Sequence, residues 1–477
     1  MKPLPDIPVS KGRLLLHASA GGILVLLSAL LLRVGPLQAL ALVIIPWACY
    51  LLIRLLERPL LAFLGVIIIN YFIMGLARYI PGLPSGGVMD MLLVMTLLFA
   101  VARSRDGAVS WDGAQNLLVL LCGVWLIYCT LLLFNPETTA SNWFASVRGL
   151  AVYFFLFSLL TAVLLGRYKY LKLFLITWSV LTLLAVGKAL MQKFIGFDPA
   201  EWRWLYEGGS STHIIYTGTR YFSFFTDAAS FGSSMGFSMV VFSIVAFYVR
   251  SKPLRIYFIA VALLAGYGLM ISGTRAAMII PFAGYALFIL LSKQWKVMIP
   301  GIVVIACVFV FFKYTYIGHG NTEIRRMRSA FHPTEDASFK IRQANQAEMR
   351  HFMKEHPFGI GIGKAKRSEP GDYMYGLPTD TSLVYVWVET GVVGLMLFLL
   401  IFVVTFVKGT RDVWTNIRNK ELKGLLSALL AGVAGMLACA YGNEMLQILP
   451  NGPILYICMA FIFMGSKLDR EISDGTT

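Results

Sequence analysis

The sequence predicts an all-α, polytopic transmembrane helical protein of about 14 spans, with a large, partly helical extracytoplasmic loop. Of the 477 residues, 58% are hydrophobic and only 14% are charged, whereas soluble domains carry roughly a quarter charged residues. Uninterrupted apolar runs of about 20 residues recur along nearly the whole chain, and each is long enough to cross a bilayer as a helix. The basic residues gather in alternate connections between these runs.

The first apolar run, which follows Lys11 and Arg13, has the basic flank of a signal peptide but is too long for one. It also lacks a convincing small-residue cleavage site, and further spans follow at once, so we expect a membrane anchor. The candidate spans, in chain order, are 14–33, 37–55, 59–77, 87–103, 114–134, 146–166, 170–192, 226–249, 254–272, 275–292, 297–313, 382–407, 421–441 and 448–466.

Lysine and arginine in short loops mark the cytoplasmic side of a membrane protein. They place both termini and every second connection inside, which leaves two long loops, 193–225 and 314–381, outside. The chain then divides into N-terminal transmembrane helices 1–192, central helices 226–313 and C-terminal helices 382–477, separated by those loops. The inward basic residues are Lys2, Lys11, Arg13, Arg54, Arg58, Arg103, Arg105, Arg167, Lys169, Lys172, Arg250, Lys252, Arg255, Lys293, Lys296, Lys408, Arg411, Arg418, Lys420, Lys423, Lys467 and Arg470.

Much of the net charge of +16 follows from this topology. No soluble segment gathers the basic residues, which argues against a nucleic-acid partner. All six cysteines fall inside predicted spans, where burial as small apolar residues is expected. Charges within spans are few: Asp90 is expected to be a helix-start charge favoured by the helix dipole, and Arg148 and Lys188 to extend toward the membrane surface.

The stretch HPFGIGIGKAKR, residues 356–367, resembles a nucleotide-binding loop because its glycines alternate ahead of a lysine. A Walker A loop, however, needs glycine where Phe358 stands and serine or threonine where Ala365 stands. The stretch also lies in a predicted external loop, away from cytoplasmic nucleotides. Two interpretations remain open: a turn after a helix, or a backbone that a phosphate or sugar can approach closely. The second makes candidate binding residues of His356, Gly359, Gly361 and Gly363.

A metal site is not expected, although five of the six histidines lie in the external loops. No pair of them has the i,i+4 spacing that puts two ligands on one helix face, and no D-x-D motif occurs. We therefore predict neither a metal nor another cofactor. The five histidines are His213, His319, His332, His351 and His356.

Three arginines stand in apolar or aromatic surroundings on the predicted external side. Arg220 lies in TGTRYFSFFTDAASFG, in an aromatic band typical of the membrane interface, and the adjacent Tyr221 is a further candidate binding residue. Arg275 lies in the very short turn ISGTRAAMII. Arg342 lies at the edge of the apolar face of an amphipathic helix predicted over 338–355, where a solvated edge charge is the plain alternative. Together the three could form a cationic site, because guanidinium groups match phosphate oxygens.

These stretches carry a resemblance to a known family. The pieces TRYFSFFTDAASFG, SGTRAA, IRQANQAEMRHFMKEHPFGIGIG and TDTSLVYVWVETGVVGL, which span about 216–395, resemble the O-antigen ligase and O-antigen polymerase family of bacterial membrane glycosyltransferases. The N-terminal spans match that family only in hydropathy. Each piece is weak alone, but their order is fairly specific.

The resemblance implies a metal-independent, inverting glycosyltransferase of lipopolysaccharide or polysaccharide biosynthesis. It would lie in the bacterial inner membrane with its active site on the periplasmic side, among membrane lipids. The donor would be a glycan on a polyprenyl diphosphate such as undecaprenyl diphosphate. The acceptor would be a lipid A core or similar glycolipid for a ligase, and another lipid-linked repeat for a polymerase.

The resemblance also implies residue roles. The diphosphate-binding arginines carry over to Arg220 and Arg342, and the usual catalytic histidine falls on Asp380 in this sequence. An alternative role for Asp380 is the N-terminal cap of the following span. A flippase or transporter for lipid-linked sugars is the competing class. Such proteins usually keep polar features near the midplane in two related halves, whereas here the polar residues concentrate in the external loops.

A topology experiment tests this arrangement. A reporter fused after Gly371 should give an external signal, and one fused after Ser251 a cytoplasmic signal, because basic loops are retained inside. The measurement is the paired activity of a periplasmic and a cytoplasmic reporter at each position. A cytoplasmic signal at Gly371 would contradict the external site.

Overall fold

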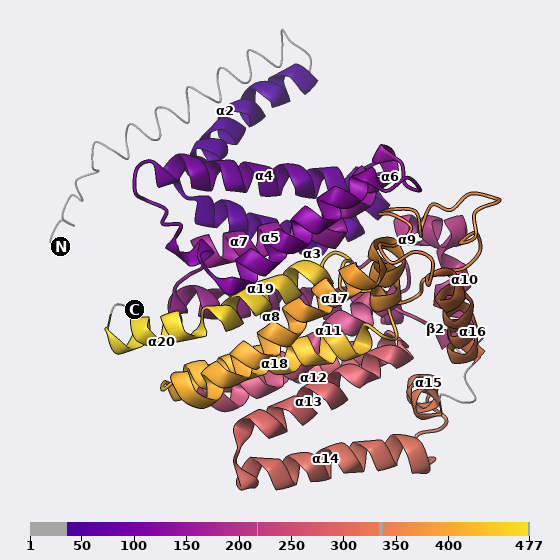
Figure 1. The fold of residues 1–477 in the computed structure, drawn as a ribbon. Coiled ribbons are helices and arrows are strands. Elements are labelled where there is room, and N and C mark those ends of the chain that lie inside the picture. Colours follow the sequence, from indigo (N-terminus) through magenta and orange to yellow (C-terminus); the bar gives the residue numbers. More distant parts are fainter. Residues whose placement is uncertain (1–35, 217, 333–336, 476–477) are drawn as a thin grey trace, which may run out of the picture.

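The computed structural model describes residues 36–216, 218–332 and 337–475, and this part of the chain is almost wholly helical (Figure 1). The longer helices are α2 (Pro36–Glu57), α3 (Pro59–Tyr79), α4 (Ser85–Ser104), α5 (Leu117–Leu131), α7 (Tyr153–Leu164), α8 (Tyr168–Phe194), α11 (Ala228–Tyr248), α12 (Lys252–Ile271), α13 (Ile279–Ser292), α14 (Trp295–Tyr314), α16 (Ala337–Phe352), α17 (Ser382–Arg411), α18 (Lys420–Cys439) and α19 (Asn451–Phe463). The shorter helices are α6 (Ala140–Val147), α9 (Pro199–Trp204), α10 (Ser210–His213), α15 (Thr322–Arg328) and α20 (Gly465–Ser473).

Single turns of other helix types extend or connect these elements. They are η1 (Asp112–Ala114), η2 (Leu132–Phe134), η3 (Arg148–Val152), η4 (Leu205–Gly209), η5 (Arg275–Met278), η6 (Ser329–Phe331) and η8 (Asp412–Asn416). Two short strands, β1 (Ile214–Ile215) and β2 (Gly218–Thr219), pair antiparallel in the first long loop, with Ile214 opposite Thr219. The predicted helical class is therefore correct apart from this two-stranded ladder.

Among the described residues, ten helices are long and apolar enough to cross a membrane, or up to eleven if the bent pair of α19 and α20 counts as one span. Each of the ten corresponds to a predicted span. The predicted total of fourteen is not confirmed. Span 14–33 lies outside the described residues, and span 37–55 corresponds to α2, which is not one of the ten. Span 297–313 corresponds to α14, of which Met298–Tyr314 counts only as a shorter apolar helix.

The last predicted span, 448–466, differs most from its expected form. Helix α19 has 13 residues and rises only about 20 Å, which is less than the roughly 30 Å of a hydrocarbon core. It then bends by 55° into the polar helix α20. The segment 440–450 before α19 is irregular and mostly buried. Such a backbone is tolerated at membrane depth where protein buries it or where it lines a cavity.

The helices form one bundle whose centre is α11, α18 and α19. Helix α11 packs along α12 and α18, and α18 packs along α13. Small residues allow close approach: a Cβ at Gly435 of α18 would lie 2.6 Å from the carbonyl oxygen of Ile280 in α13. Close backbone contact through small residues is how helices associate inside membranes.

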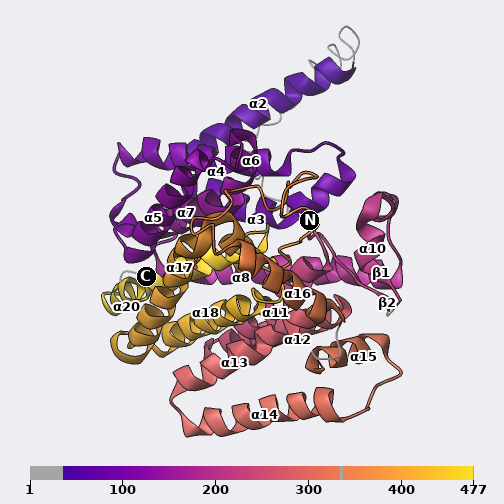
Figure 2. The same cartoon turned by 45° about the vertical axis from the view of Figure 1, so that its right-hand side comes forward.

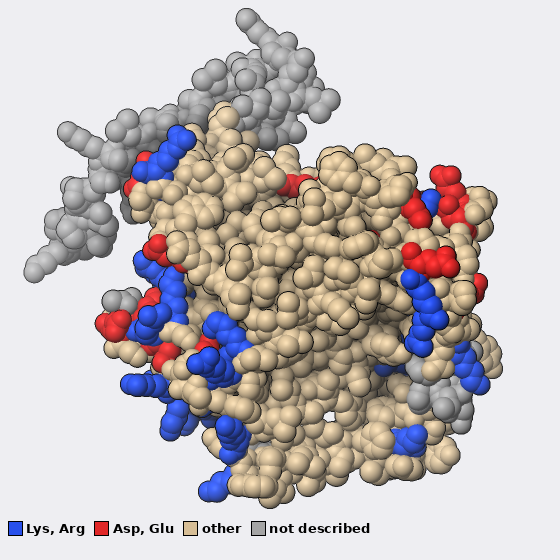
Figure 3. Space-filling model, in the orientation of Figure 1, with Lys and Arg blue, Asp and Glu red and all other residues tan. Residues whose placement is uncertain are grey.

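The two ends of the bundle differ. Figure 1 places α9, α10, α15 and α16 at one end and α20 at the other, and Figure 2 again separates α10 and α15 from α20. Figure 3 shows a largely uncharged belt between two charged ends, with lysine and arginine crowded at the end that carries α20. The two loops predicted to be external therefore meet at one end, where they build the candidate site.

Candidate active site

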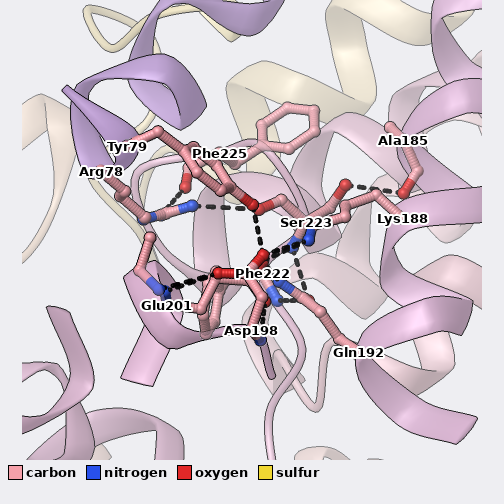
Figure 4. A network of polar contacts seen from close by, with 11 residues as sticks. Arg78, Tyr79, Ala185, Lys188, Gln192, Asp198, Glu201, Phe222, Ser223 and Phe225 are labelled. Atoms are coloured by element: carbon pink, nitrogen blue, oxygen red, sulfur yellow. Dashed lines mark hydrogen bonds and ion pairs between the residues drawn. The ribbon is translucent and has the colours of Figure 1, made fainter. Parts of the chain in front are cut away.

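A buried polar network anchors the first long loop to the bundle (Figure 4). Arg78, in the last turn of α3, donates hydrogen bonds to the carbonyl oxygens of Ser223 (3.0 Å), Thr226 (3.1 Å) and Phe225. Its guanidinium carbon also lies 4.5 Å from the ring centroids of Trp204 and Phe222. Carbonyl dipoles and two aromatic faces thus offset the cost of burying this cation.

Helix α8 supplies the second half of the network. The Gln192 side-chain oxygen accepts hydrogen bonds from the backbone nitrogens of Phe222 (3.2 Å) and Ser223 (2.9 Å), and its amide nitrogen donates to Glu201. The Lys188 ammonium lies 2.9 Å from a carboxylate oxygen of both Asp198 and Glu201. Burial alone would raise the pKa of Asp198, but hydrogen bonds from Tyr79 and Lys188 outweigh it and lower the pKa to about 2. The loop is thereby fixed between Arg220 and Asp227.

His213 connects this loop to the start of α11. Burial lowers its pKa to about 4, so the imidazole is neutral near pH 7. Its partners assign the tautomer: Nδ1 donates to the Gly209 carbonyl at 2.8 Å, and Nε2 accepts from the Ala228 backbone nitrogen at 3.0 Å. The Asp227 carboxylate caps the same helix through Ser230 N, at 2.8 Å. His213 therefore has a structural role here.

Four arginines line one pocket of about 450 Å³, which we call the arginine pocket. Arg220 comes from the first loop, Arg275 from η5, Arg326 from α15 and Arg342 from α16. The structure thus brings together the three arginines predicted from the sequence and adds a fourth. Further lining residues are Thr212, Ile215, Gly273, Thr274, Ala276, Ile279, Ser329, Ala330, Ala438, Tyr441, Gly442 and Asn443.

The arginines are held differently. Arg220 donates to the Thr212 carbonyl (3.0 Å) and the Thr274 hydroxyl (3.1 Å). Burial and the neighbouring Arg275 lower the pKa of Arg220, and Asp227 opposes them. Arg326 donates to the Gly273 carbonyl at 2.6 Å. No hydrogen bond joins Arg342 to another residue in the described ranges. Arg220 and Arg326 are therefore held in place by hydrogen bonds, and Arg342 lines the same pocket.

A second pocket, of about 780 Å³, adjoins the first and shares Thr212, Arg220 and Asn443 with it. We call it the Asp380 pocket. Its acidic lining residues are Asp227, Asp380 and Glu444. The two pockets thus form one continuous depression with a cationic part and an acidic part.

Asp380 has a geometry suited to a reactive carboxylate. Its φ is +53°, a conformation in which aspartate, asparagine and histidine are enriched among non-glycine residues. Although the residue as a whole is exposed, the protein around its carboxylate displaces enough water to raise its pKa, and Arg342 acts in the opposite direction. The capping alternative is wrong, because Thr381 caps α17 by accepting a hydrogen bond from Val384 N at 3.2 Å.

The glycines of HPFGIGIG are packed closely against other parts of the chain and do not line these pockets. Gly359, Gly361 and Gly363 all have φ between 79° and 88°. A Cβ at Gly359 would lie 2.6 Å from backbone atoms of Glu389 and Gly391, and one at Gly363 would lie 2.3 Å from the Asn142 carbonyl oxygen. Close approach is needed at these positions, but the neighbours are other residues of this chain: backbone at Gly359 and Gly363, and the Thr138 side chain at Gly361.

Two further candidates lie away from both pockets. His356 stacks on Phe352 and contacts Glu137, with Nε2 at 3.0 Å from a carboxylate oxygen. Tyr221 packs against Phe197. A binding role for His356, Tyr221 and the three glycines stays a prediction. In the described ranges, no group of three histidine, cysteine, aspartate or glutamate side chains comes close enough to hold a metal ion.

Sequence reasoning missed the segment 440–450. Ser382 holds it in place: its hydroxyl oxygen accepts hydrogen bonds from the backbone nitrogens of Met445 (2.8 Å) and Leu446 (3.0 Å). Asn443 lines both pockets, and Glu444 lines the Asp380 pocket. Burial raises the pKa of Glu444, whereas its contact with Lys366 lowers it. The sequence does carry one signal for this segment. YGNEMLQ, residues 441–447, has several polar residues, although it only joins two predicted spans.

The fold and the site define a polytopic helical membrane protein with a cationic pocket at one end of its bundle. Residues 259–399 match the family described as O-Antigen ligase. The matched region contains most of the motifs that carry the predicted resemblance, and the match supports that resemblance. Together with the helical membrane fold, it supports a membrane glycosyltransferase-like function with lipid-linked glycan substrates. A search of curated proteins found no significant match.

The backbone contact at Gly391 generates a stability prediction. Gly391 has φ +72°, and a Cβ there would lie 2.0 Å from the Pro357 carbonyl oxygen. Gly391→Ala should therefore lower the free energy of unfolding by at least about 2 kcal/mol, from backbone strain and overlap together. The measurement is the melting temperature of the full chain in detergent, followed by size-exclusion chromatography.

Gly376→Ala is the matched control. Gly376 has φ +79° but no atom within 4 Å of a built Cβ, so its substitution costs only the backbone strain, about 1–2 kcal/mol. Equal losses at Gly376 and Gly391 would contradict a packing role for the contact.

Proposed function

We propose that this chain transfers a glycan from a polyprenyl diphosphate to an acceptor hydroxyl at the periplasmic face of the bacterial inner membrane. The acceptor would be a lipid A core or a similar glycolipid, as for an O-antigen ligase. The observation that carries the proposal is the continuity of the arginine pocket with the Asp380 pocket. One part suits a diphosphate and the other suits a hydroxyl nucleophile.

The arginine pocket would stabilise the leaving group. In an inverting transfer, the acceptor oxygen attacks the anomeric carbon and the bond from that carbon to the diphosphate oxygen breaks. The electron pair leaves on the diphosphate, whose charge Arg220, Arg275, Arg326 and Arg342 can offset without a metal. Preorganised donors of this kind each contribute about 10²–10³ in rate. Arg342, which is not held by another described residue, is suited to close on the donor.

Asp380 would accept the proton of the attacking hydroxyl. A carboxylate whose pKa lies above its ordinary value of 3.8 is a better proton acceptor, and burial moves Asp380 in that direction. Arg342 opposes the effect of burial and limits the rise in the pKa of Asp380. The positive φ of Asp380 also fits the family resemblance, because histidine is among the few residue types that adopt it readily.

A repeat-unit polymerase is the alternative within the same chemistry, with a second lipid-linked glycan as acceptor. A deletion strain separates the two. A ligase leaves lipid-linked polymer accumulated and unattached, whereas loss of a polymerase leaves single repeats attached to the anchor.

The arginine assignment predicts that Arg220→Ala and Arg342→Ala each lower transfer about 10²–10³-fold, while the protein still inserts. Lysine at either position should rescue only partly, because a point charge cannot copy a bidentate fork. Transfer is measured from the glycan gel profile of membranes carrying each variant, and it should survive EDTA.

Arg350→Ala is the matched control, since Arg350 lies on the same helix as Arg342, is exposed and lines neither pocket. It should leave transfer near normal. Near-normal transfer by both Arg220→Ala and Arg342→Ala would overturn the assignment.

The base assignment predicts that Asp380→Asn lowers transfer about 10²–10⁴-fold with normal protein level. Asparagine tolerates the same backbone conformation, so the fold should be unaffected. In the wild type, activity should fall as pH drops through a value above 3.8, because the base becomes protonated. The measurement is the pH profile of initial rates with each variant.

Thr381→Ala separates chemistry from capping. It should cost about 1 kcal/mol of stability through loss of the cap, yet retain transfer per folded molecule. Asp380→His should keep part of the activity if this position is equivalent to the family histidine. An Asp380→Asn variant with normal rates would exclude the carboxylate as base.

A further inference from the structure

A third pocket, of about 340 Å³, continues the row beyond the Asp380 pocket. It shares Lys366, Glu444 and Ile448 with the Asp380 pocket. Its far wall is formed by the start of α4 and by Arg148 of η3, so we call it the Arg148 pocket. Lys366 and Glu444 form an ion pair at the boundary between the two pockets. A chain-like molecule could therefore extend from Asp380 into the Arg148 pocket.

Gln447 indicates that the Arg148 pocket binds a polar ligand. It lines the pocket and is 9% exposed. Neither its side-chain oxygen nor its side-chain nitrogen has a hydrogen-bond partner within the described ranges. A buried amide without hydrogen-bond partners costs about 1–3 kcal/mol of folding free energy. A bound group that both donates and accepts a hydrogen bond would satisfy Gln447 and remove this cost. A sugar hydroxyl, which both donates and accepts, is such a group.

The remaining lining fits a sugar ring. Ser85, Ser146, Tyr153 and Tyr385 bring hydroxyl groups to the same pocket. Tyr385 also brings an aromatic face, which the Lys366 ammonium covers at 4.8 Å from the ring centroid. Ligand sites commonly combine apolar walls with a few convergent polar groups.

The charges of the pocket fit a single negative charge. Arg148 is paired with Asp90 at 3.1 Å, and Asp90 also accepts a hydrogen bond from Tyr153. Lys366 is paired with Glu444. Arg367 has no carboxylate within ion-pair distance in the described ranges, and its one hydrogen bond there, to the Asn142 carbonyl, is long at 3.4 Å. One cation thus remains for the ligand, which matches a carboxylate better than a dianionic phosphate.

We infer that the Arg148 pocket is an acceptor subsite for an acidic sugar of the uronic acid type. Gln447 and the tyrosine hydroxyls would bind the sugar hydroxyls, and Arg367 would pair with the carboxylate. The inference rests on the proposed function, because it takes the acceptor hydroxyl to lie at Asp380 and the rest of the acceptor beyond Lys366.

Binding of methyl glucuronide to the purified full chain in nanodiscs tests this directly, by saturation-transfer NMR with methyl glucoside as the neutral probe. The glucuronide should bind at least about fivefold more tightly than the glucoside. Gln447→Met, which removes only the unsatisfied amide, should weaken glucuronide binding about tenfold while melting temperature is kept or raised. Should that variant fail to fold, Arg367→Gln, which removes the cation assigned to the carboxylate, should weaken glucuronide binding similarly and leave glucoside binding unchanged.

Arg342→Ala, on the far side of the arginine pocket, should leave glucuronide binding unchanged. Equal binding of both probes, unchanged binding in Gln447→Met, or loss of binding in Arg342→Ala would each overturn the inference. Displacement of the glucuronide by phosphatidylglycerol nanodiscs, relative to phosphatidylcholine nanodiscs, would instead assign the pocket to a lipid headgroup. This test measures binding and needs no turnover. A negative result here would overturn only the acceptor subsite, whereas the proposed function would be overturned by near-normal transfer in Arg220→Ala and Arg342→Ala.

Discussion

The position of the second long loop depends on one backbone contact at the break in α17. At Gly391 the backbone leaves helical geometry, with φ +72° and ψ −174°. The break releases carbonyl groups that the helix would otherwise use, and the protein supplies other partners. Ile360 N donates to the Val388 carbonyl at 3.0 Å, and the Tyr128 hydroxyl donates to the Thr390 carbonyl at 2.7 Å. Within a membrane protein such replacements are required, because unsatisfied backbone groups cost several kcal/mol.

The two long loops are fixed to the helical bundle by different kinds of interaction. The first is tied to α3 and α8 by buried ions, where Arg78, Lys188 and Gln192 satisfy the loop's carbonyls, carboxylates and amides. The second is tied by close backbone packing at Gly359 and Gly363 and by contacts nearer the surface, among them the ion pair between Lys366 and Glu444. Arg220 therefore sits on an electrostatically fixed frame, whereas Arg342 lies on α16, beyond the packed glycines. This difference suits a site in which one part binds the donor and another closes on it.

The pockets form a row along which the charge changes. Four cations line the arginine pocket and three carboxylates line the Asp380 pocket. At the Arg148 pocket, Arg367 is the one cation without a carboxylate partner among the residues that the structure describes. The segment 440–450 contributes to all three through Asn443, Glu444 and Gln447. An irregular backbone is what allows successive residues to face different pockets, since a helix would present only every third or fourth residue to one side.

The sequence by itself predicted the helical membrane class, the resemblance to the O-antigen ligase family and the three arginines that the structure brings to one pocket, because hydropathy runs and local motifs are readable without knowledge of contacts. It also located Asp380 next to α17. Only the tertiary structure decided that Thr381 caps that helix, that Arg326 joins the arginines and that Gly359 meets the backbone at Gly391. The sequence did not show that the segment 440–450 lines the pockets, and the predicted span count is not confirmed, for one physical reason. Apolar composition reports how much of a segment is buried, but not whether lipid or neighbouring helices bury it, and that depends on residues far apart in the chain.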